Sequence, residues 1–342
     1  MSSDNNNNNN IVNIEYNRVT NVTSTDFPGF SANSYDQSWD LQKFRDSLKV
    51  DISKLDEREA NFDLIHIDTS IANAFRRIMI SEVPCVAAEA VYFYNNTSVL
   101  QDEVLAHRIG LVPLKIDPDE LQWCDDSLPE NERYNDKNTI VLTLDVQCTR
   151  NPNAPKDCTD PNILYNNSNV YAKDLKFQPE GDQEEVFKNR PIVPCDPDIL
   201  LCKLRPGQEI SLRVHCILGI GSDHAKFSPV STSSYRLMPH ITILQPIKGE
   251  SAKRFQKCFP SGVIGIDNKG CAFVQDSRKD TVSREVLRHQ EFQDHVKLGR
   301  VRDHFIFNVE STGAMTPEEI FFKSVRILKN KADYLKNCPI AQ

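Results

Sequence analysis

The sequence predicts an α+β fold in which a discontinuous domain, a sheet with two amphipathic helices, is interrupted by a β-rich insertion. Apolar segments with the two-residue alternation of strands recur along the chain. One amphipathic helical segment lies near the front of the chain and another near the rear. Between them, short strands alternate with Pro- and Asn-rich connectors. With 342 residues, the chain has room for one large domain or two moderate ones.

Residues 1–12 are polar and contain six consecutive asparagines. Such a segment buries too little apolar surface to fold, so we predict a disordered tail there. It has no basic region followed by an apolar run, so it does not resemble a secretory signal. Residues 13–85 are predicted as the first part of the discontinuous domain. Within them, SWDLQKFRDSLKV predicts a short helix built on Trp39, Leu41, Phe44 and Leu48.

The front of the domain is a strand followed by a helix. FDLIHI is the strand, and the helix carries its apolar residues at i, i+4, i+7 and i+8. Asp68 to Ser70 offer side-chain oxygens that can cap the first backbone N–H groups, and Pro84 ends the helix. We call the apolar side of this helix the front stripe, and it comprises Ile71, Phe75, Ile78 and Met79.

Residues 86–227 are predicted as the β-rich insertion. TIVLTLDVQC and EISLRVHCILGIG are strands, with a turn at Pro206-Gly207 before the second. Residues 228–342 then return to the discontinuous domain, beginning with the strand YRLMPHITILQP. Within this part, residues 249–299 are rich in charges and are predicted as an excursion of loop and helix.

The rear of the chain repeats the pattern of the front. HFIFNVE alternates as a strand with one buried face, and a turn follows it. Thr316 and Glu319 form a capping box around Pro317, which predicts the start of a long helix. Its apolar side, the rear stripe, comprises Phe321, Val325, Leu328, Ala332 and Leu335. We expect the front and rear helices to meet and to need a partner surface for their stripes.

Composition excludes several classes of function. The net charge is -8, which argues against a chain that binds polyanions as a whole. No apolar run is long enough to span a membrane. Ten cysteines are present but no C-x-x-C pair, and Cys85 is expected to be buried rather than reactive.

Four separated blocks carry a family resemblance: NAFRRIMISEVP, NNTSVLQDEVLAHRIGLVPL, GSDHAKFSPVSTSSYRLMP and FNVESTGAMTPEEIFFKSVRILK. Together they resemble the alpha-like subunits of multisubunit RNA polymerases, over most of residues 60–338. The resemblance implies that the discontinuous domain is a dimerisation domain. It also implies a dimer that nucleates assembly of the two large catalytic subunits.

Within this family, the segments LRPGQEISL and GIGSDHAKFSPV look most like the larger alpha-like subunit shared by polymerases I and III. The polymerase II counterpart usually has a zinc-binding cysteine cluster after its HRIGLVPL, where this chain has only Cys124. Archaeal relatives can carry an iron–sulfur cluster near residues 250–298, where this chain has only Cys258 and Cys271. We therefore predict no metal and no cofactor. The third-largest subunit of polymerase II remains the alternative.

The resemblance also implies two contact surfaces and no catalytic residue. The heterodimer interface would be Ile71, Phe75, Ile78, Met79, Phe321, Val325, Leu328 and Ala332. Docking of the large subunits would involve Arg76, Arg77, His107, Arg108, His224, Lys226 and Phe227. On residue type alone, the arginines could equally form a solvated or ion-paired helix face, and the histidines could be structural.

The predicted function is therefore a non-catalytic assembly subunit of RNA polymerases I and III, which transcribe rRNA, 5S rRNA and tRNA. Its partners would be the smaller alpha-like subunit and the two largest subunits, with little or no direct contact to nucleic acid. The resemblance places it in the nucleus, including the nucleolus. Two other classes remain open: a thiol- or metal-dependent enzyme using the Cys and His residues, and a DNA-binding adaptor using Arg76 and Arg77.

Overall fold

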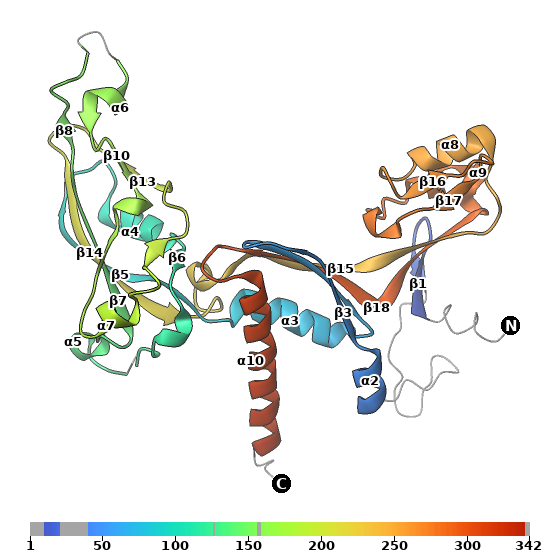
Figure 1. Ribbon diagram of the computed structural model, residues 1–342, viewed down its shortest axis with the longest axis horizontal. Helices are drawn as coiled ribbons and strands as arrows, with labels where there is room; N and C mark the ends of the chain where they lie inside the picture. Colours follow the sequence, from blue (N-terminus) through green and yellow to red (C-terminus); the bar gives the residue numbers. More distant parts are fainter. Residues whose placement is uncertain (1–9, 21–39, 126, 156–158, 339–342) are drawn as a thin grey trace. The chain divides into compact units, whose positions relative to one another are not determined.

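The structure is a computed structural model that describes residues 10–20, 40–125, 127–155 and 159–338 (Figure 1). It is a mixture of helices and sheets, as the sequence predicts. Within the described residues, no helix combines the length and the apolar character needed to cross a membrane.

The chain forms two compact units, and each gathers segments that are distant in sequence. The first unit, which we call the sheet unit, comprises Met1–Lys54, Asn61–Asn73 and Ser234–Asn308. The second, which we call the helix unit, comprises Leu55–Ala60, Ala74–Ser233 and Val309–Gln342. Most of the front helix and the whole rear helix therefore group with the β-rich segment. The boundaries that the sequence predicts for the β-rich insertion, near residues 85 and 227, stay a prediction.

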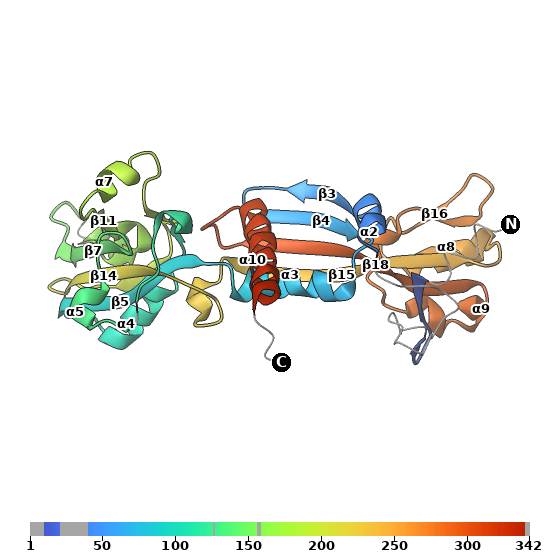
Figure 2. The ribbon, with the colours of Figure 1, turned by 90° about the horizontal axis from the view of Figure 1, so that it is seen from below.

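A six-stranded sheet provides most of the sheet unit (Figure 2). Its order is β2-β1-β18-β4-β3, and β15 also pairs with β18. Side chains alternate between its two faces, and Phe62 and Phe307 stack on one of them with ring centroids 5.2 Å apart. The strands are β1 (Ile11–Ile14), β2 (Val19–Thr20), β3 (Lys49–Leu55), β4 (Glu59–Ile65), β15 (Val230–Ile243) and β18 (Val296–Ser311).

The predicted tail and the predicted helix near residue 41 have different outcomes. Residues 1–9 lie outside the described part of the chain. Ile11 and Val12, which the sequence placed in the tail, pair instead with Val301 and Arg300 of β18. The predicted helix is α2 (Leu41–Ser47), whose N-cap Asp40 accepts hydrogen bonds from the N–H groups of Gln42 and Lys43.

Residues 249–299 form a small cluster with its own core. Phe255 and Phe292 are fully buried there, with ring centroids 5.3 Å apart. The predicted excursion of loop and helix thus also contains a two-stranded hairpin of β16 and β17. Its elements are α8 (Gly249–Lys257), β16 (Ile264–Ile266), β17 (Ala272–Val274), η5 (Ser277–Lys279), η6 (Glu285–Arg288) and α9 (Gln290–Gln293).

A four-stranded sheet in the order β11-β7-β14-β5 forms the core of the helix unit. Its strands are β5 (Cys85–Asn96), β7 (Thr139–Gln147), β11 (Lys176–Gln178) and β14 (Glu209–Gly219). The central strand β14 pairs with β5 from Ile210–Asn96 to Gly219–Cys85, and with β7 on its other side. Alternate β14 residues such as Leu212 and Val214 are buried, as the alternation of EISLRV predicts.

Three helices of the chain concern the candidate site: α3 (Thr69–Ser81), α4 (Asp102–Gly110) and α10 (Pro317–Asn337). Shorter elements of the helix unit connect the strands. They are β6 (Leu114–Lys115), η2 (Pro118–Glu120), α5 (Glu130–Arg133), β8 (Thr149–Arg150), α6 (Pro161–Leu164), β9 (Tyr165–Asn166), β10 (Asn169–Tyr171), η3 (Ala172–Asp174), α7 (Gln183–Val186), β12 (Val193–Pro194), β13 (Leu200–Lys203) and η4 (Ala225–Phe227).

Candidate interaction surface

The front and rear helices contact each other within the helix unit. The rings of Phe75 on α3 and Phe321 on α10 meet edge to face, with centroids 5.5 Å apart. Three turns further along α10, Lys331 forms an ion pair at 2.5 Å with Glu82, just beyond the end of α3. Each contact joins two residues that lie more than 240 positions apart in the sequence. Together the two contacts set where α10 crosses α3 (Figure 1).

Local sequence sets where both helices begin. The Asp68 carboxylate accepts a hydrogen bond from the N–H of Ser70 at 2.7 Å, so α3 starts at Thr69. At the start of α10, Thr316 accepts from the N–H of Glu319, and the Glu319 carboxylate accepts from the N–H of Thr316. This is the predicted capping box, with Pro317 in the first turn.

The front stripe is largely covered within the chain itself. Met79 is fully buried and Ile78 is only 3% exposed, whereas Ile71 and Phe75 are half-buried. Ile78 and Met79 therefore already have their packing partners in this chain. Of the front stripe, Ile71 and Phe75 retain surface that a second chain could contact.

The rear stripe is different, because much of it is exposed. Val325 is 39% exposed and Leu335 is 70% exposed, while Phe321 and Leu328 are half-buried. Ile320 and Ser324, on an adjacent side of α10, are the fully buried positions that attach the helix to its own chain. From Lys329 to Asn337, which includes Ala332, every residue is exposed.

Two exposed aromatic residues on α10 were missed by the sequence analysis. Phe322 is 61% exposed and Tyr334 is 70% exposed, and neither belongs to the rear stripe. With Val325 and Leu335 they give one helix four large exposed side chains with apolar character. Large exposed apolar side chains on one helix make that helix a candidate contact for another protein. Their residue type was visible in the sequence, but a search restricted to one helical period does not select them.

The loop before β15 brings several predicted docking residues together. The N–H of Ser222 donates to the carbonyl of Ser81 at 2.9 Å, which ties the loop to the end of α3. Phe227 is only 4% exposed, so it packs inside its own chain instead of projecting from it. Its ring lies over Gly219, where a Cβ atom would come within 2.7 Å of the ring. This close approach requires glycine at position 219.

Lys226 and Arg108 also have partners within the chain. Lys226 forms an ion pair with Glu89 at 2.5 Å, and its ammonium lies 5.1 Å from the centroid of the Phe227 ring. Arg108 on α4 donates to the carbonyls of Leu200 and Leu201 at 2.6 and 3.0 Å. These contacts tie both side chains to their own chain, although Arg108 remains exposed.

Arg77, His107, Arg108 and His224 are the exposed members of the predicted docking set. The rings of His107 and His224 lie 6.2 Å apart, although they come from separate segments. Arg77 is exposed on α3, and Arg76 beside it is half-buried. The loop before β15 thus contacts both the end of α3 and, through His224, helix α4.

The described cysteines are mostly buried. Burial raises the pKa of the Cys85 and Cys216 thiols to about 12, so both are protonated at neutral pH. Cys258 is buried and Cys271 is half-buried. In the part of the chain that the structure describes, no three His, Cys, Asp or Glu side chains come together as metal ligands would.

Comparison with known proteins agrees with the predicted resemblance. The profile of the RNA polymerase Rpb3/Rpb11 dimerisation domain matches residues 61–332. The chain is 75% identical over 334 residues to the DNA-directed RNA polymerases I and III subunit RPAC1 of Saccharomyces cerevisiae, covering 97% of this chain and 99% of that protein. It is 46% identical to the RPAC1 subunit of Homo sapiens, covering 92% and 90%.

A polymerase II subunit is also similar but more distant. The rpb3 subunit of Dictyostelium discoideum is 32% identical over 293 residues, covering 83% of this chain and 92% of that protein. The profile match and the near full-length relatives lead to the same assignment. The chain belongs to the RNA polymerase Rpb3/Rpb11 dimerisation domain family.

Proposed function

We propose that this protein is a non-catalytic assembly subunit of RNA polymerases I and III. The observation that carries the proposal is the 75% identity, over 97% of the chain, to a subunit named for these two polymerases. The polymerase II relative reaches 32%, which disfavours the alternative of a third-largest subunit of polymerase II. This role would place the protein in the nucleus, including the nucleolus.

The rear helix is the proposed contact with the smaller alpha-like subunit. Fully burying a side chain such as Val, Leu or Phe contributes about 1.5–3 kcal/mol. Val325, Leu335 and Phe322 all retain exposed surface that a second chain can bury. An obligate interface buries on the order of 2,000 Å² or more, so we expect α10 to provide its centre together with the exposed part of Phe75.

The contacts between α3 and α10 support a templating mechanism. Because Phe75 and Phe321 pack together within one chain, the crossing of the two helices is set before a partner arrives. A preorganised surface costs less conformational entropy on binding than one that must first be ordered. The protein would thus present a ready surface and do no chemistry itself.

We place docking of the second-largest subunit on Arg76, Arg77, His107 and His224. Lys226, Arg108 and Phe227 would hold the underlying segments in place through the contacts that they already make. Arg76→Glu is expected to leave the heterodimer intact and to weaken capture of the second-largest subunit at least about tenfold, because it replaces an attractive contact with a repulsive one. Quantitative mass spectrometry of material purified on the tagged chain measures both partners. If the Arg76→Glu chain recovered as much of the second-largest subunit as the unmodified chain does, this placement would be contradicted.

Purification from cells tests the function as a whole. A tagged chain should copurify at equal stoichiometry with a smaller alpha-like subunit and with large subunits of both polymerase I and polymerase III. Recovery of the chain alone would overturn the proposal, and recovery with polymerase II subunits only would support the alternative.

A further inference from the structure

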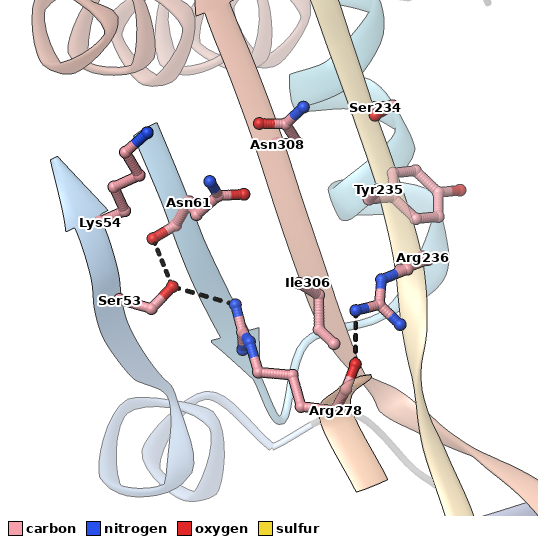
Figure 3. A pocket seen from close by; sticks show the side chains of 9 residues that line it. All are labelled: Ser53, Lys54, Asn61, Ser234, Tyr235, Arg236, Arg278, Ile306 and Asn308. Atoms are coloured by element: carbon pink, nitrogen blue, oxygen red, sulfur yellow. Dashed lines mark hydrogen bonds between the residues drawn. The ribbon is translucent and has the colours of Figure 1, made fainter. Parts of the chain in front are cut away.

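A polar cavity lies on one face of the six-stranded sheet, within the sheet unit (Figure 3). Its volume is about 340 Å³. Four neighbouring strands and the short helix η5 contribute its walls. The lining residues are Ser53 and Lys54 of β3, Asn61 of β4, Ile306 and Asn308 of β18, Ser234, Tyr235 and Arg236 of β15, and Arg278 of η5.

The alternation of the strands explains why this face is polar. On β18, Phe305 and Phe307 are fully buried, and Tyr235 packs against both rings. Asn308 and Ile306 alternate with them and line the cavity. The face of the sheet that carries Phe305 and Phe307 is therefore buried in the core. The lining of the cavity combines hydroxyl, amide and cationic groups with Ile306 and an edge of Tyr235.

The lining is strongly cationic. Among the described residues that line it are Lys54, Arg236 and Arg278, and none is an aspartate or glutamate. The adjacent Asp63 is buried and already engaged, because Arg278 donates to its carboxylate and His304 Nε2 lies 2.8 Å from Oδ2. Arg278 also donates to the hydroxyl of Ser53 at 3.0 Å. Its guanidinium is thus fixed at the wall of the cavity.

Arg236 is the cation whose charge is least compensated. Its guanidinium donates to the backbone carbonyls of Arg278 and Asp280 at 2.6 and 3.1 Å, and within the described residues it forms no ion pair. Burial first, and the neighbouring Arg278 charge second, lower the pKa of Arg236, although the nearby carboxylates of Asp280 and Asp63 oppose this. An anion in the cavity would favour the charged form of this group.

We propose that this cavity binds the carboxylate of an aspartate or glutamate side chain from an acidic protein segment. The guanidinium of Arg236, held by two backbone carbonyls, with Lys54 at the rim and Arg278 beside it, matches the charge and the hydrogen-bonding capacity of a carboxylate. Pockets for whole small molecules are mostly apolar, whereas this one has a polar lining. This favours a charged side chain delivered by a protein.

The neighbouring edge of the sheet gives a protein segment access. β3 supplies Ser53 and Lys54 and is the last strand of the sheet. All seven of its residues are exposed, so the described part of the chain does not cover this side. The whole chain carries a net charge of -8, which makes a local cationic cavity a selective feature for an acidic segment rather than a general property of the surface.

Binding of a fluorescein-labelled hexaglutamate peptide to the full chain tests the proposal. Fluorescence anisotropy should show saturable binding that weakens as salt is added. Arg236→Gln should weaken it about tenfold, and Lys54→Gln about threefold, because each removes a charge-assisted contact. The matched control is Lys269→Gln, an exposed lysine in the turn between β16 and β17, which should change binding by less than about twofold.

A carbodiimide cross-link locates the peptide. It joins an amine to a carboxylate in direct contact, so mass spectrometry should find the peptide on Lys54 and not on Lys269. Arg236→Lys, which keeps the charge, should retain more binding than Arg236→Gln, and circular dichroism verifies that each variant is folded. The proposal would be overturned if the unmodified chain showed no saturable binding, or if Lys54→Gln and Arg236→Gln bound the peptide as tightly as the unmodified chain does. Full displacement of the peptide by inorganic phosphate at low millimolar concentration would also overturn it, because it would identify a phosphate site instead.

Discussion

The two amphipathic helices look alike in sequence but differ in what covers their apolar sides. On α3, Ile78 and Met79 are buried within the chain. On α10, Val325 and Leu335 are 39% and 70% exposed. A helical period identifies an apolar stripe but does not say whether the same chain or another one covers it. The difference suggests that α3 anchors the pair of helices and that α10 carries the surface for a partner.

The largest expected effect separates the anchoring helix from the contact helix. Met79→Asp places an unpaired carboxylate at a fully buried position, so we expect the free energy of unfolding to fall by about 4 kcal/mol or more. Chemical denaturation followed by circular dichroism measures this change in the chain alone. Met79→Leu, which conserves volume, should cost less than about 1.5 kcal/mol. A Met79→Asp chain of normal stability that fails only to bind its partner would reverse the roles of the two helices.

The second expected effect is on pairing rather than folding. Val325→Asp should change the stability of the single chain by no more than about 1 kcal/mol, because this side chain is partly exposed there. It should abolish heterodimer formation, since pairing would bury an unpaired charge in an apolar interface. Copurification with the smaller alpha-like subunit is the measurement.

The matched control for Val325→Asp is Asn330→Asp. This residue is exposed on the same helix, and the helical repeat places it on the side opposite to the rear stripe. It should pair normally. Full copurification of the Val325→Asp chain would show that the rear stripe is not the interface.

A smaller effect concerns the crossing of the two helices. Phe75 and Phe321 meet edge to face, so a double-mutant cycle with alanine at both positions should give a coupling energy of about 0.5–1.5 kcal/mol in the single chain. Denaturation of the two single variants and the double variant supplies the cycle. Additive losses would mean that the two helices do not stabilise each other.

The smallest effect is expected at the ion pair between Lys331 and Glu82. Both side chains have access to solvent, with 53% and 28% exposure. Lys331→Ala should therefore cost about 0.2–1 kcal/mol, and the difference from the unmodified chain should shrink at high salt. Thermal unfolding of the variant and of the unmodified chain, at low and at high ionic strength, measures this difference. A salt-independent loss would point to packing of the lysine stem instead of its charge.

Local features of the fold could be predicted from the sequence because they depend on neighbours along the chain. The capping box of Thr316 and Glu319 and the cap at Asp68 are both present as predicted. The alternating strands HFIFNVE and EISLRV also form as expected within β18 and β14. Each of these patterns is determined within a few residues.

Features that depend on distant contacts were missed. The packing of Phe227 over Gly219 was not foreseen, and its role in contacting another subunit stays a prediction. The acceptors of Arg108 are carbonyls more than 90 positions away and could not be foreseen, and its docking role stays a prediction. Ile11 and Val12 follow a polar tail, and their strand forms only because β18 offers an edge. No local pattern encodes these partners, so periodicity could not identify them.

Helix α4 could have been predicted from the sequence, but the sequence analysis did not predict it. Leu105 and Ile109 are spaced i, i+4 and are both buried in α4, with Asp102 and Glu103 in its first turn. The acidic start and the apolar spacing are helix signals. The sequence analysis interpreted this segment only through its resemblance to the family, which explains the omission.

Hydrogen exchange of the chain with and without its partner tests the central claim most directly. If α10 carries the interface, the backbone amides of α10 from Val325 onward should exchange faster in the chain alone and become protected in the heterodimer. The amides around Ile78 and Met79 should be protected in both states. Unchanged exchange in α10 on pairing, or protection gained mainly in α3, would contradict the account.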